Sequence, residues 1–286
     1  MRLRILLVPY DSGRRDARMG RGPDALARHG AASTLRAAGH DVDAEVVEVD
    51  EPFPAEVGTT FALYRRLAER VRAAAADGRT PLVLSGNCGA AVGTVSGARR
   101  SPNERVGVVW LDAHGDFNTP ETSASGFLDG MMLAALAGRC WRGMTASVPG
   151  FAPVRAEDVL LVGARDLDAA EGDALADAGV TLLPWERVRE RGAAAALAPA
   201  LDGLARRVER VYLHVDVDVL DPAIARGNAL APPGGLTPQE LGDVARAVRA
   251  RCGMAAAGVA SYDPAYDADG GVFRAAVGAL EAIAGG

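Results

Sequence analysis

The chain has 286 residues, of which 49% are hydrophobic and only 5% aromatic, so a large core must be built mainly from aliphatic side chains. The formal net charge is −6 at pH 7, and the arginines are dispersed among acidic residues, which argues against nucleic acid or an anionic membrane as a partner. The three scattered cysteines form no CxxC pair, which indicates reduced thiols and a cytoplasmic location.

The N-terminus begins basic and then becomes apolar, as a signal peptide would. The apolar run ends at Pro9 after about five residues, which is too short for a secretory signal, so we interpret it as a buried first strand. No uninterrupted apolar run in the chain approaches the ~20 residues of a membrane span. We therefore expect no membrane association.

Short β-branched or Leu-rich runs alternate with Ala-rich segments of helical length along the chain. Several of the short runs are apolar on both faces, as expected for parallel strands that are covered by helices on either side. The predicted elements are, in chain order, strand 4–9, helix 23–38, strand 43–49, helix 61–76, strand 81–85, helix 88–98, strand 106–112, helix 129–137, strand 159–163, helix 167–178, strand 180–183, helix 186–208, strand 211–216, helix 238–251, strand 254–260 and helix 273–283.

This alternation predicts an α/β fold with a mostly parallel sheet of about eight strands. No linker, repeat or low-complexity tract interrupts it, so we predict a single domain over residues 1–286. Pro23 and Pro238 sit where a first helical turn tolerates proline, and Thr237-Pro-Gln-Glu240 predicts a capping box. In open α/β sheets, functional groups gather just beyond the carboxyl ends of strands, so polar clusters should follow the predicted strands.

Two aspartate-rich motifs do so. Asp112-Ala-His-Gly-Asp116 comes at the end of one predicted strand, and Asp216-Val-Asp218 comes at the end of another. Because alternate residues of a strand point to the same face, Asp216 and Asp218 project together, as do Asp112 and His114. Two strand ends therefore bring four carboxylates and one imidazole into one crevice.

Packing these acids together is unfavourable without cations, because like charges and burial both penalise ionised carboxylates. Divalent metal resolves the conflict. Oxygen-rich ligands with one imidazole favour manganese, with zinc, iron or nickel as alternatives, and two ions that share carboxylates fit the number of acids better than one. A bridging water would then become a nucleophile near neutral pH. Either motif alone is also typical of a magnesium–phosphate site or a capped turn, so the prediction depends on both together.

At these residues the sequence resembles the arginase, agmatinase and formimidoylglutamase (ureohydrolase) superfamily. Residues 112–116 resemble its DAHxD motif, 216–222 its DxDxxDP motif and 118–126 the arginase substrate loop, while 85–89 lies where the GGDHS motif falls. Two stretches within residues 11–23 also resemble the N-terminal region of the family. The resemblance implies a three-layer α/β/α sandwich, a homotrimer or homohexamer, and hydrolysis of a guanidino or related amidine carbon by metal-activated hydroxide.

Carried over by position, the resemblance also implies the ligands of two manganese ions. Asp112 and Asp216 would bridge the ions, and the remaining ligands would complete one ion or the other. The implied ligand set is Cys88, Asp112, His114, Asp116, Asp216 and Asp218.

Cys88 departs from the family pattern, because it occupies the position of a metal-binding histidine. A thiolate can bind metal, but it favours softer ions than manganese, and it would have to be deprotonated. Alternatively, Cys88 is a small buried thiol away from the metal, and that ion is weakly held or absent. Both interpretations stay open.

Asp129 is a second departure, because arginases carry a histidine there that is thought to shuttle protons. An aspartate can do acid–base work if neighbouring acids raise its pKa. It can also pair with a cationic substrate group, or cap the helix that follows. Asp129 and Asp116 are our candidate catalytic residues.

Ser261 is the third departure. It lies where the family has a VEVNP-like stretch, whose glutamate clamps the guanidinium. A neutral hydroxyl cannot supply the charge-assisted pairing that a guanidinium prefers, although Asp263 or Asp129 could compensate from another direction. This argues against ordinary arginase activity.

The remaining candidates are less specific. Asn118, Ser125 and Asp168 match positions that hold the polar end of an amino-acid substrate, and together with Ser261 they are our candidate substrate-binding residues. They are equally compatible with loop-forming turns and, for Asp168, a helix N-cap. His214 shares its strand face with Asp216 but lies one step deeper, so we expect a hydrogen-bonded core histidine rather than a ligand.

Three functions compete at this point. The first is a metal-dependent hydrolase of a linear C–N bond in a guanidine, amidine or formimino compound. The second keeps the metals but acts on an uncharged or N-substituted amidine or amide in biosynthesis. The third is a degenerate relative that binds a small molecule or regulates a partner. For the two enzymes, the expected partner is a small-molecule substrate.

Overall fold

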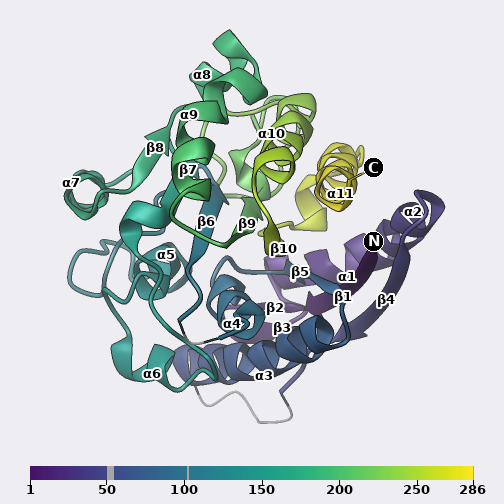
Figure 1. The fold of residues 1–286 in the computed structure, drawn as a ribbon, viewed down its shortest axis with the longest axis horizontal. Coiled ribbons are helices and arrows are strands. Elements are labelled where there is room, and N and C mark those ends of the chain that lie inside the picture. Colours follow the sequence, from purple (N-terminus) through teal and green to yellow (C-terminus); the bar gives the residue numbers. More distant parts are fainter. Residues whose placement is uncertain (50–54, 102, 286) are drawn as a thin grey trace.

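A computed structural model describes residues 1–49, 55–101 and 103–285. In this part of the chain, eight parallel strands form one sheet (Figure 1). All eight predicted strands are present, with ends shifted by a few residues. In sheet order they are β4 (Asp41–Val46), β1 (Arg2–Val8), β5 (Thr80–Ser85), β10 (Met254–Ala260), β9 (Arg210–Asp216), β6 (Val106–Leu111), β7 (Val159–Val162) and β8 (Thr181–Leu183).

Helices cover both faces of this sheet, so the predicted α/β/α sandwich is confirmed. Figure 1 shows α3 and α4 on one side and α9, α10 and α11 on the other, and each side has its own apolar core. One layer contains α3 (Glu56–Ala76), α4 (Ala90–Ala98), α5 (Met132–Leu136), α6 (Arg142–Ala146) and α7 (Ala169–Ala178). The other contains α1 (Gly22–Arg28), α2 (Ala31–Ala37), α8 (Trp185–Arg191), α9 (Ala193–Ala205), α10 (Pro238–Arg251) and α11 (Gly271–Ala284).

The helix predictions need correction where glycines interrupt them. The helix predicted over 23–38 is two helices that meet at Gly30, whose φ is +111°, and the one predicted over 186–208 is broken at Gly192, whose φ is +74°. Glycine adopts such angles without the steric cost that a side chain would add. The helix predicted over 129–137 starts as a 3-10 turn over Asp129–Met131 before α5. The apolar pattern of the sequence predicts neither α6 nor the small antiparallel hairpin of β2 (Tyr10–Asp11) and β3 (Arg14–Arg15).

The capping box at the start of α10 is confirmed. The Thr237 hydroxyl accepts a hydrogen bond from the backbone N–H of Glu240 at 3.1 Å, and the Glu240 carboxylate accepts one from the backbone N–H of Thr237 at 2.8 Å. Two backbone donors that the helix leaves unpaired are satisfied in this way.

Side-chain alternation along the central strands decides on which face the polar cluster lies. In β6, Val109 and Leu111 belong to the core under α8–α11, whereas Val108 and Trp110 belong to the core under α3–α7. Because alternate residues of a strand point to the same face, Asp112 points to the same side of the sheet as Val108 and Trp110. Its carboxylate therefore faces the α3–α7 layer.

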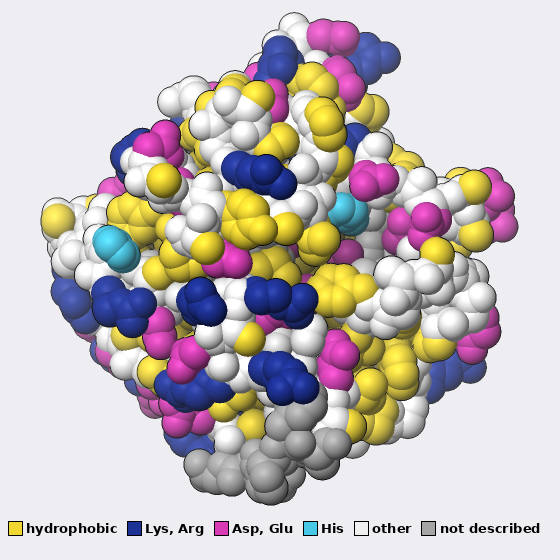
Figure 2. Space-filling view, turned by 180° about the vertical axis from the view of Figure 1, so that it is seen from behind, with side chains coloured by type: hydrophobic (Ala, Val, Ile, Leu, Met, Phe, Trp, Pro, Cys, Tyr) yellow, Lys and Arg dark blue, Asp and Glu magenta, His cyan; other side chains and the backbone are white. Residues whose placement is uncertain are grey.

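Charged side chains are mixed over the surface. On the face shown in Figure 2, arginines are interleaved with acidic side chains. At the sheet edge, Arg4 lies 2.8 Å from Asp43 and Arg79 lies 3.0 Å from Asp41. Among the described residues, no helix combines the length and the apolar character needed to cross a membrane.

Candidate metal centre

Four neighbouring strands converge on one cluster of polar side chains. Cys88 lies just after β5, Ser261 just after β10, Asp216 at the end of β9 and Asp112 just after β6. These strands are consecutive in the sheet, in the order β5-β10-β9-β6. Their parallel carboxyl ends therefore meet at one place, and the two aspartate motifs do come together as predicted.

Asp112 is a buried carboxylate at the centre of the cluster. Its Oδ1 accepts a hydrogen bond from the backbone N–H of His114 at 2.8 Å, and its Oδ2 accepts one from the Trp110 indole at 2.9 Å. The Cys88 Sγ atom lies 4.0 Å from the same Oδ2. Asp112 thus faces both the thiol and the second aspartate motif.

Asp216 and Asp218 present their carboxylates side by side at the end of β9. The Asp216 Oδ1 accepts the backbone N–H of Asp218 at 2.8 Å, while its Oδ2 accepts the Cys88 thiol at 2.8 Å and also the Ser261 hydroxyl. The His114 Nδ1 lies 3.3 Å from Asp218 Oδ2 and 3.4 Å from Asp112 Oδ1. One imidazole is therefore held between the two motifs.

A strained turn brings Asp116 into the cluster. Its φ is +50°, and its backbone oxygen accepts the N–H groups of Leu133 and Ala134 at 2.9 and 3.0 Å, which fixes the turn to the start of α5. The buried Glu171 carboxylate supports the same turn by accepting the Phe117 N–H at 2.8 Å. Asp116 itself is buried, and its Oδ2 has no hydrogen-bond partner among the described residues.

Burial and like charges shift the acidity of the whole cluster. Burial and then the neighbouring Asp218 raise the pKa of Asp112 to about 6, against the effect of His114. Burial and neighbouring carboxylates raise the pKa of Asp116 and of Asp216 well above the ordinary range. Burial lowers the pKa of His114, but its hydrogen bonds to Asp112 and Asp218 outweigh this and raise the pKa to about 12. A divalent cation would neutralise these carboxylates in place of protons.

Two groups of three side chains could each hold one metal ion, with one ligand atom from every side chain. Asp112, His114 and Asp218 form one group, and Cys88, Asp112 and His214 form the other; within each group the ligand atoms lie within 4.8 Å of one another. Asp112 belongs to both groups. The unpaired Asp116 oxygen is a further possible ligand atom, and carboxylates with an imidazole suit divalent cations.

The cluster lines a pocket of about 280 Å³. The loop after Asp116 forms part of its wall, where the Asn118 amide donates to Asp168 at 3.2 Å and Ser125 accepts the Phe127 N–H at 3.1 Å. Asp168 is the N-cap residue of α7, but its side chain makes no capping bond. The predicted substrate-binding residues Asn118, Ser125, Asp168 and Ser261 all line this pocket.

Comparison with known proteins identifies the architecture. The family model described as "Arginase family" matches residues 1–284. The chain is 33% identical over 254 residues to an arginase of Bacillus caldovelox, covering 82% of each chain, and 30% identical over 305 residues to an arginase of Brevibacillus brevis, covering 98% of this chain and 97% of the relative. A crystal structure of arginase from Bacillus cereus superposes with a TM-score of 0.90 at 28% identity, covering 100% of this chain and 99% of the other.

The chain belongs to the arginase family. The resemblance that the aspartate motifs indicated is thereby confirmed. Around the candidate metal centre, this arginase-family chain departs from the family pattern at Cys88, Asp129 and Ser261.

The position of Cys88 in this arginase-family protein is fixed by Asp129. The Asp129 carboxylate accepts hydrogen bonds from the backbone N–H groups of Cys88 and Gly89 at 3.0 and 2.8 Å and from the Asn87 amide at 2.9 Å. Asp129 therefore sits at the N-terminus of α4, where a negative charge is favourable. Asp129 is itself the first residue of the 3-10 turn Asp129–Met131, whose N-cap residue is Leu128, so it is not the cap of that turn. Burial raises the pKa of Asp129 to about 7, despite these hydrogen bonds.

Ser261 lines the pocket, but its hydroxyl is bonded to a carboxylate of the cluster rather than free for a substrate. Its hydroxyl bonds to Asp216 Oδ2 and lies 3.4 Å from Cys88 Sγ, and its φ is +65°. Asp263, which we considered as a replacement, instead accepts the N–H of Ala265 at 3.0 Å at the start of a 3-10 turn and does not line the pocket. The Ser261 hydroxyl thus contacts a candidate metal ligand.

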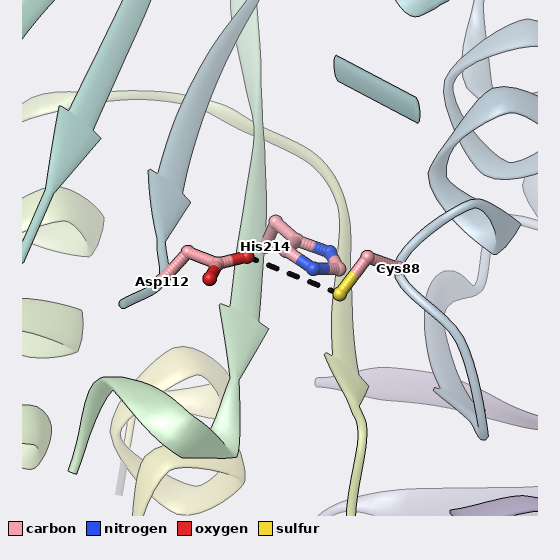
Figure 3. Close-up of side chains that lie close together, drawn as sticks. All are labelled: Cys88, Asp112 and His214. Carbon is pink, nitrogen blue, oxygen red and sulfur yellow. Dashed lines mark hydrogen bonds between the residues drawn. The ribbon is translucent and has the colours of Figure 1, made fainter. Parts of the chain in front are cut away.

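His214 lies closer to the candidate ligands than its position in β9 predicts. It is a buried, hydrogen-bonded histidine of β9, as expected, with its Nδ1 3.0 Å from the Tyr212 hydroxyl. It also lies beside Cys88 and Asp112 (Figure 3). Its strand parity with Asp216 was the available signal, but only the packing of β5 against β10 shows that Cys88 comes within its reach.

Proposed function

We propose that this arginase-family protein is a metal-dependent hydrolase that cleaves a linear C–N bond in a guanidine, amidine or formimino compound. The observation that carries the proposal is the convergence of both aspartate motifs and His114 on one pocket. The buried, unpaired oxygen of Asp116 adds a ligand atom that needs a cation. The family match agrees with this chemistry.

We propose two divalent ions, with manganese as the resident metal of at least one. Asp112 and Asp216 would contact both ions, His114 and Asp218 would complete one, and Asp116 would help to complete the other. When bound, such ions supply Lewis acidity and make water a nucleophile near neutral pH.

The residues of the chain have separate tasks in this proposal. Asp129 lines the pocket and has a pKa raised to about 7 by burial, so it can hold or release a proton at neutral pH. Asn118, Ser125 and Asp168 would bind the polar end of the substrate away from the ions. Asp116 stays charged only beside a cation, because burial raises its pKa strongly.

The charge of the pocket favours a cationic substrate. Seven of the residues that line it are acidic, and none of its described lining residues is lysine or arginine. Even after two divalent ions neutralise part of this charge, a guanidinium or amidinium group meets carboxylates rather than cations. The acidic lining residues are Asp116, Asp129, Asp166, Asp168, Glu171, Asp216 and Asp218.

The test is a substrate screen with metal-reconstituted protein. Metal-free protein is supplied with Mn²⁺, and release of urea and ammonia is measured with arginine, agmatine, guanidinobutyrate and formimidoylglutamate. We expect turnover of at least one compound, which disappears in Asp216→Ala and persists in Asp243→Ala, a change on the surface of α10. Metal content near zero that does not respond to added Mn²⁺ would overturn the proposal.

A second candidate function follows from Ser261. Its hydroxyl is committed to Asp216 rather than to a substrate guanidinium, which favours an uncharged or N-substituted amidine or amide in biosynthesis. Robust release of urea from arginine would rule this candidate out. A purely binding relative is less consistent with the cluster, because an unpaired buried carboxylate without catalytic use only costs stability.

We also propose that residues 1–286 act as one cytoplasmic domain in a homo-oligomer, a trimer or hexamer, with a small molecule as partner and no nucleic acid. The assembly is what the resemblance to the ureohydrolase superfamily implies. Light scattering coupled to size exclusion measures the oligomer directly, and a monomeric mass would contradict it.

A further inference from the structure

His214 has one ring nitrogen engaged and the other free. The Nδ1 atom lies 3.0 Å from the Tyr212 hydroxyl, whereas the buried Nε2 has no hydrogen-bond partner among the described residues. Buried polar atoms are rarely left unpaired in native proteins. The unpaired imidazole nitrogen therefore calls for a partner, and the residue lies beside Cys88 and Asp112.

The ring is held firmly in this orientation. Trp110 stacks on it, with ring centroids 3.8 Å apart and an interplanar angle of 22°, and the two residues are paired across β6 and β9. The Trp110 indole in turn donates to Asp112 Oδ2 at 2.9 Å. The same aromatic side chain thus orients both the imidazole and the carboxylate.

Three ligand atoms of different chemistry surround one point. Figure 3 shows Cys88 from the loop before α4, Asp112 from the end of β6 and His214 from β9 turned toward one another. Their ligand atoms lie within 4.8 Å of each other, whereas ligands of one ion at bond lengths of about 2.0–2.3 Å are separated by roughly 3–4 Å. A small inward movement of the three side chains around an ion would bring their ligand atoms to this separation.

We propose that His214 is a metal ligand in this protein, so that one ion of the proposed centre is held by the Cys88 thiolate, the His214 Nε2 and the shared Asp112 carboxylate. The inference rests on the metal centre of the proposed function and assigns its ligands differently, because the family pattern leaves His214 outside it. Cys88 stands where the family has a metal-binding histidine. In this proposal, the imidazole nitrogen of His214, two positions before Asp216 on β9, takes the place of that histidine nitrogen.

The hydrogen bond to Tyr212 fits this role. A metal-bound histidine donates its other N–H to a neighbouring acceptor, which fixes the tautomer and orients the ring. With Nδ1–H donating to the Tyr212 oxygen, Nε2 keeps its lone pair for the ion. Gly258 on β10 makes this arrangement possible, since a side chain there would collide with the Tyr212 hydroxyl.

The two ions then differ in the metals that they prefer. Sulfur, nitrogen and oxygen donors at the Cys88–His214–Asp112 position favour zinc, cobalt or cadmium, whereas the two carboxylates and His114 at the other position suit manganese. Binding at the first position forms a metal–sulfur bond and breaks the Cys88 S–H bond, whose proton passes to solvent. No oxidation or reduction is involved.

Cadmium reports the proposed bonds directly. Metal-free protein with ¹⁵N-labelled histidine rings is titrated with ¹¹³Cd²⁺, and scalar coupling between cadmium and ring nitrogen is measured by NMR. The chain has four histidines, so the spectrum is simple. We expect two coupled nitrogens, one lost in His214→Asn and the other in His114→Asn, with both retained in His29→Asn, an exposed control.

The variants separate the possible outcomes. His214→Asn should weaken binding of the ion at the Cys88 position by roughly tenfold or more, and retained coupling to His114 shows that the variant is folded. A single coupled nitrogen that survives His214→Asn and disappears in His114→Asn would overturn the inference and leave the proposed function standing. Coupling to neither histidine would overturn both.

Discussion

The Cys88 thiol donates a hydrogen bond of 2.8 Å to Asp216 Oδ2, although the two residues are 128 positions apart in the chain. Burial, together with the charge of Asp216 and its neighbours, raises the pKa of the Cys88 thiol well above its ordinary value. An ion that uses Cys88 must therefore displace this proton. The identity of the side chain at position 88 should therefore influence which metal binds.

Replacing Cys88 should change which metal the site selects. In Cys88→His, we expect the ratio of Mn²⁺ to Cd²⁺ affinity to rise by roughly tenfold or more, because an imidazole replaces a soft sulfur donor. In Cys88→Ser, Cd²⁺ binding should weaken more than Mn²⁺ binding. Competitive titration of the metal-free proteins measures both ratios. Equal ratios in all three proteins would show that Cys88 lies off the metal.

Asp129 should be needed for the Cys88 loop as well as for proton transfer. An amide at this position presents one acceptor oxygen instead of two, so Asp129→Asn leaves a buried backbone N–H of Cys88 or Gly89 unpaired. We expect a loss of about 1–3 kcal/mol of unfolding free energy and weaker Cd²⁺ binding. Urea denaturation and cadmium titration measure the two effects.

The matched control for this change is Asp168→Asn, which alters an exposed carboxylate of the same pocket and should change stability by less than about 0.5 kcal/mol. A purely catalytic role for Asp129 predicts a different pattern. Turnover and its pH profile would then change in Asp129→Asn, while stability and metal affinity would match those of the unaltered protein.

Stability should depend on pH in opposite ways with and without metal. The folded pKa values of Asp112 and Asp129 are about 6 and about 7, above the ordinary value of 3.8, chiefly because both groups are buried. The folded metal-free protein therefore binds more protons than the unfolded chain over this range. The stability that these groups contribute is fully present below about pH 4 and is lost as the pH rises through 6 and 7.

Bound metal needs the Asp112 carboxylate deprotonated, so its stabilising effect grows with pH. We expect the difference in Tm between metal-loaded and metal-free protein to increase from about pH 5 to about pH 8. Differential scanning fluorimetry at several pH values measures it. A difference that stays constant over this range would contradict the assignment of Asp112 to the metal.

A buried ion pair at the opposite end of the strands should matter for stability alone. Arg210, the first residue of β9, donates to Glu104 at 2.7 and 2.9 Å, and both side chains are largely buried. Arg210→Met should cost about 3–5 kcal/mol, because it leaves the Glu104 carboxylate buried without its partner. Chemical denaturation gives this value, and cadmium binding should not change.

Arg246→Met is the comparison, since Arg246 pairs with Asp243 on the surface of α10 and such pairs contribute about 0–1 kcal/mol. Equal losses in the two variants would mean that burial does not decide the strength of these pairs.

Local sequence patterns were enough to predict much of the architecture. The alternation of apolar runs and Ala-rich segments predicted all eight strands, because parallel strands under two helical layers are apolar on both faces. The helix predictions failed at Gly30 and Gly192, where a single glycine with a positive φ ends one helix and starts another. The periodicity of the flanking residues does not reveal such a break, since the apolar pattern continues across it.

The sequence by itself determined the fold class and the two aspartate motifs at strand ends, because strand parity and strand termini are local properties of the chain. Only the tertiary structure decided that β5, β10, β9 and β6 are neighbours, that Cys88 meets Asp216 and His214, and that Asp129 holds the Cys88 loop. These contacts join residues far apart in the chain. The order of the strands in the sheet and the packing of the loops at their ends create these contacts. Neither the strand order nor the loop packing follows from the spacing of residues in the sequence.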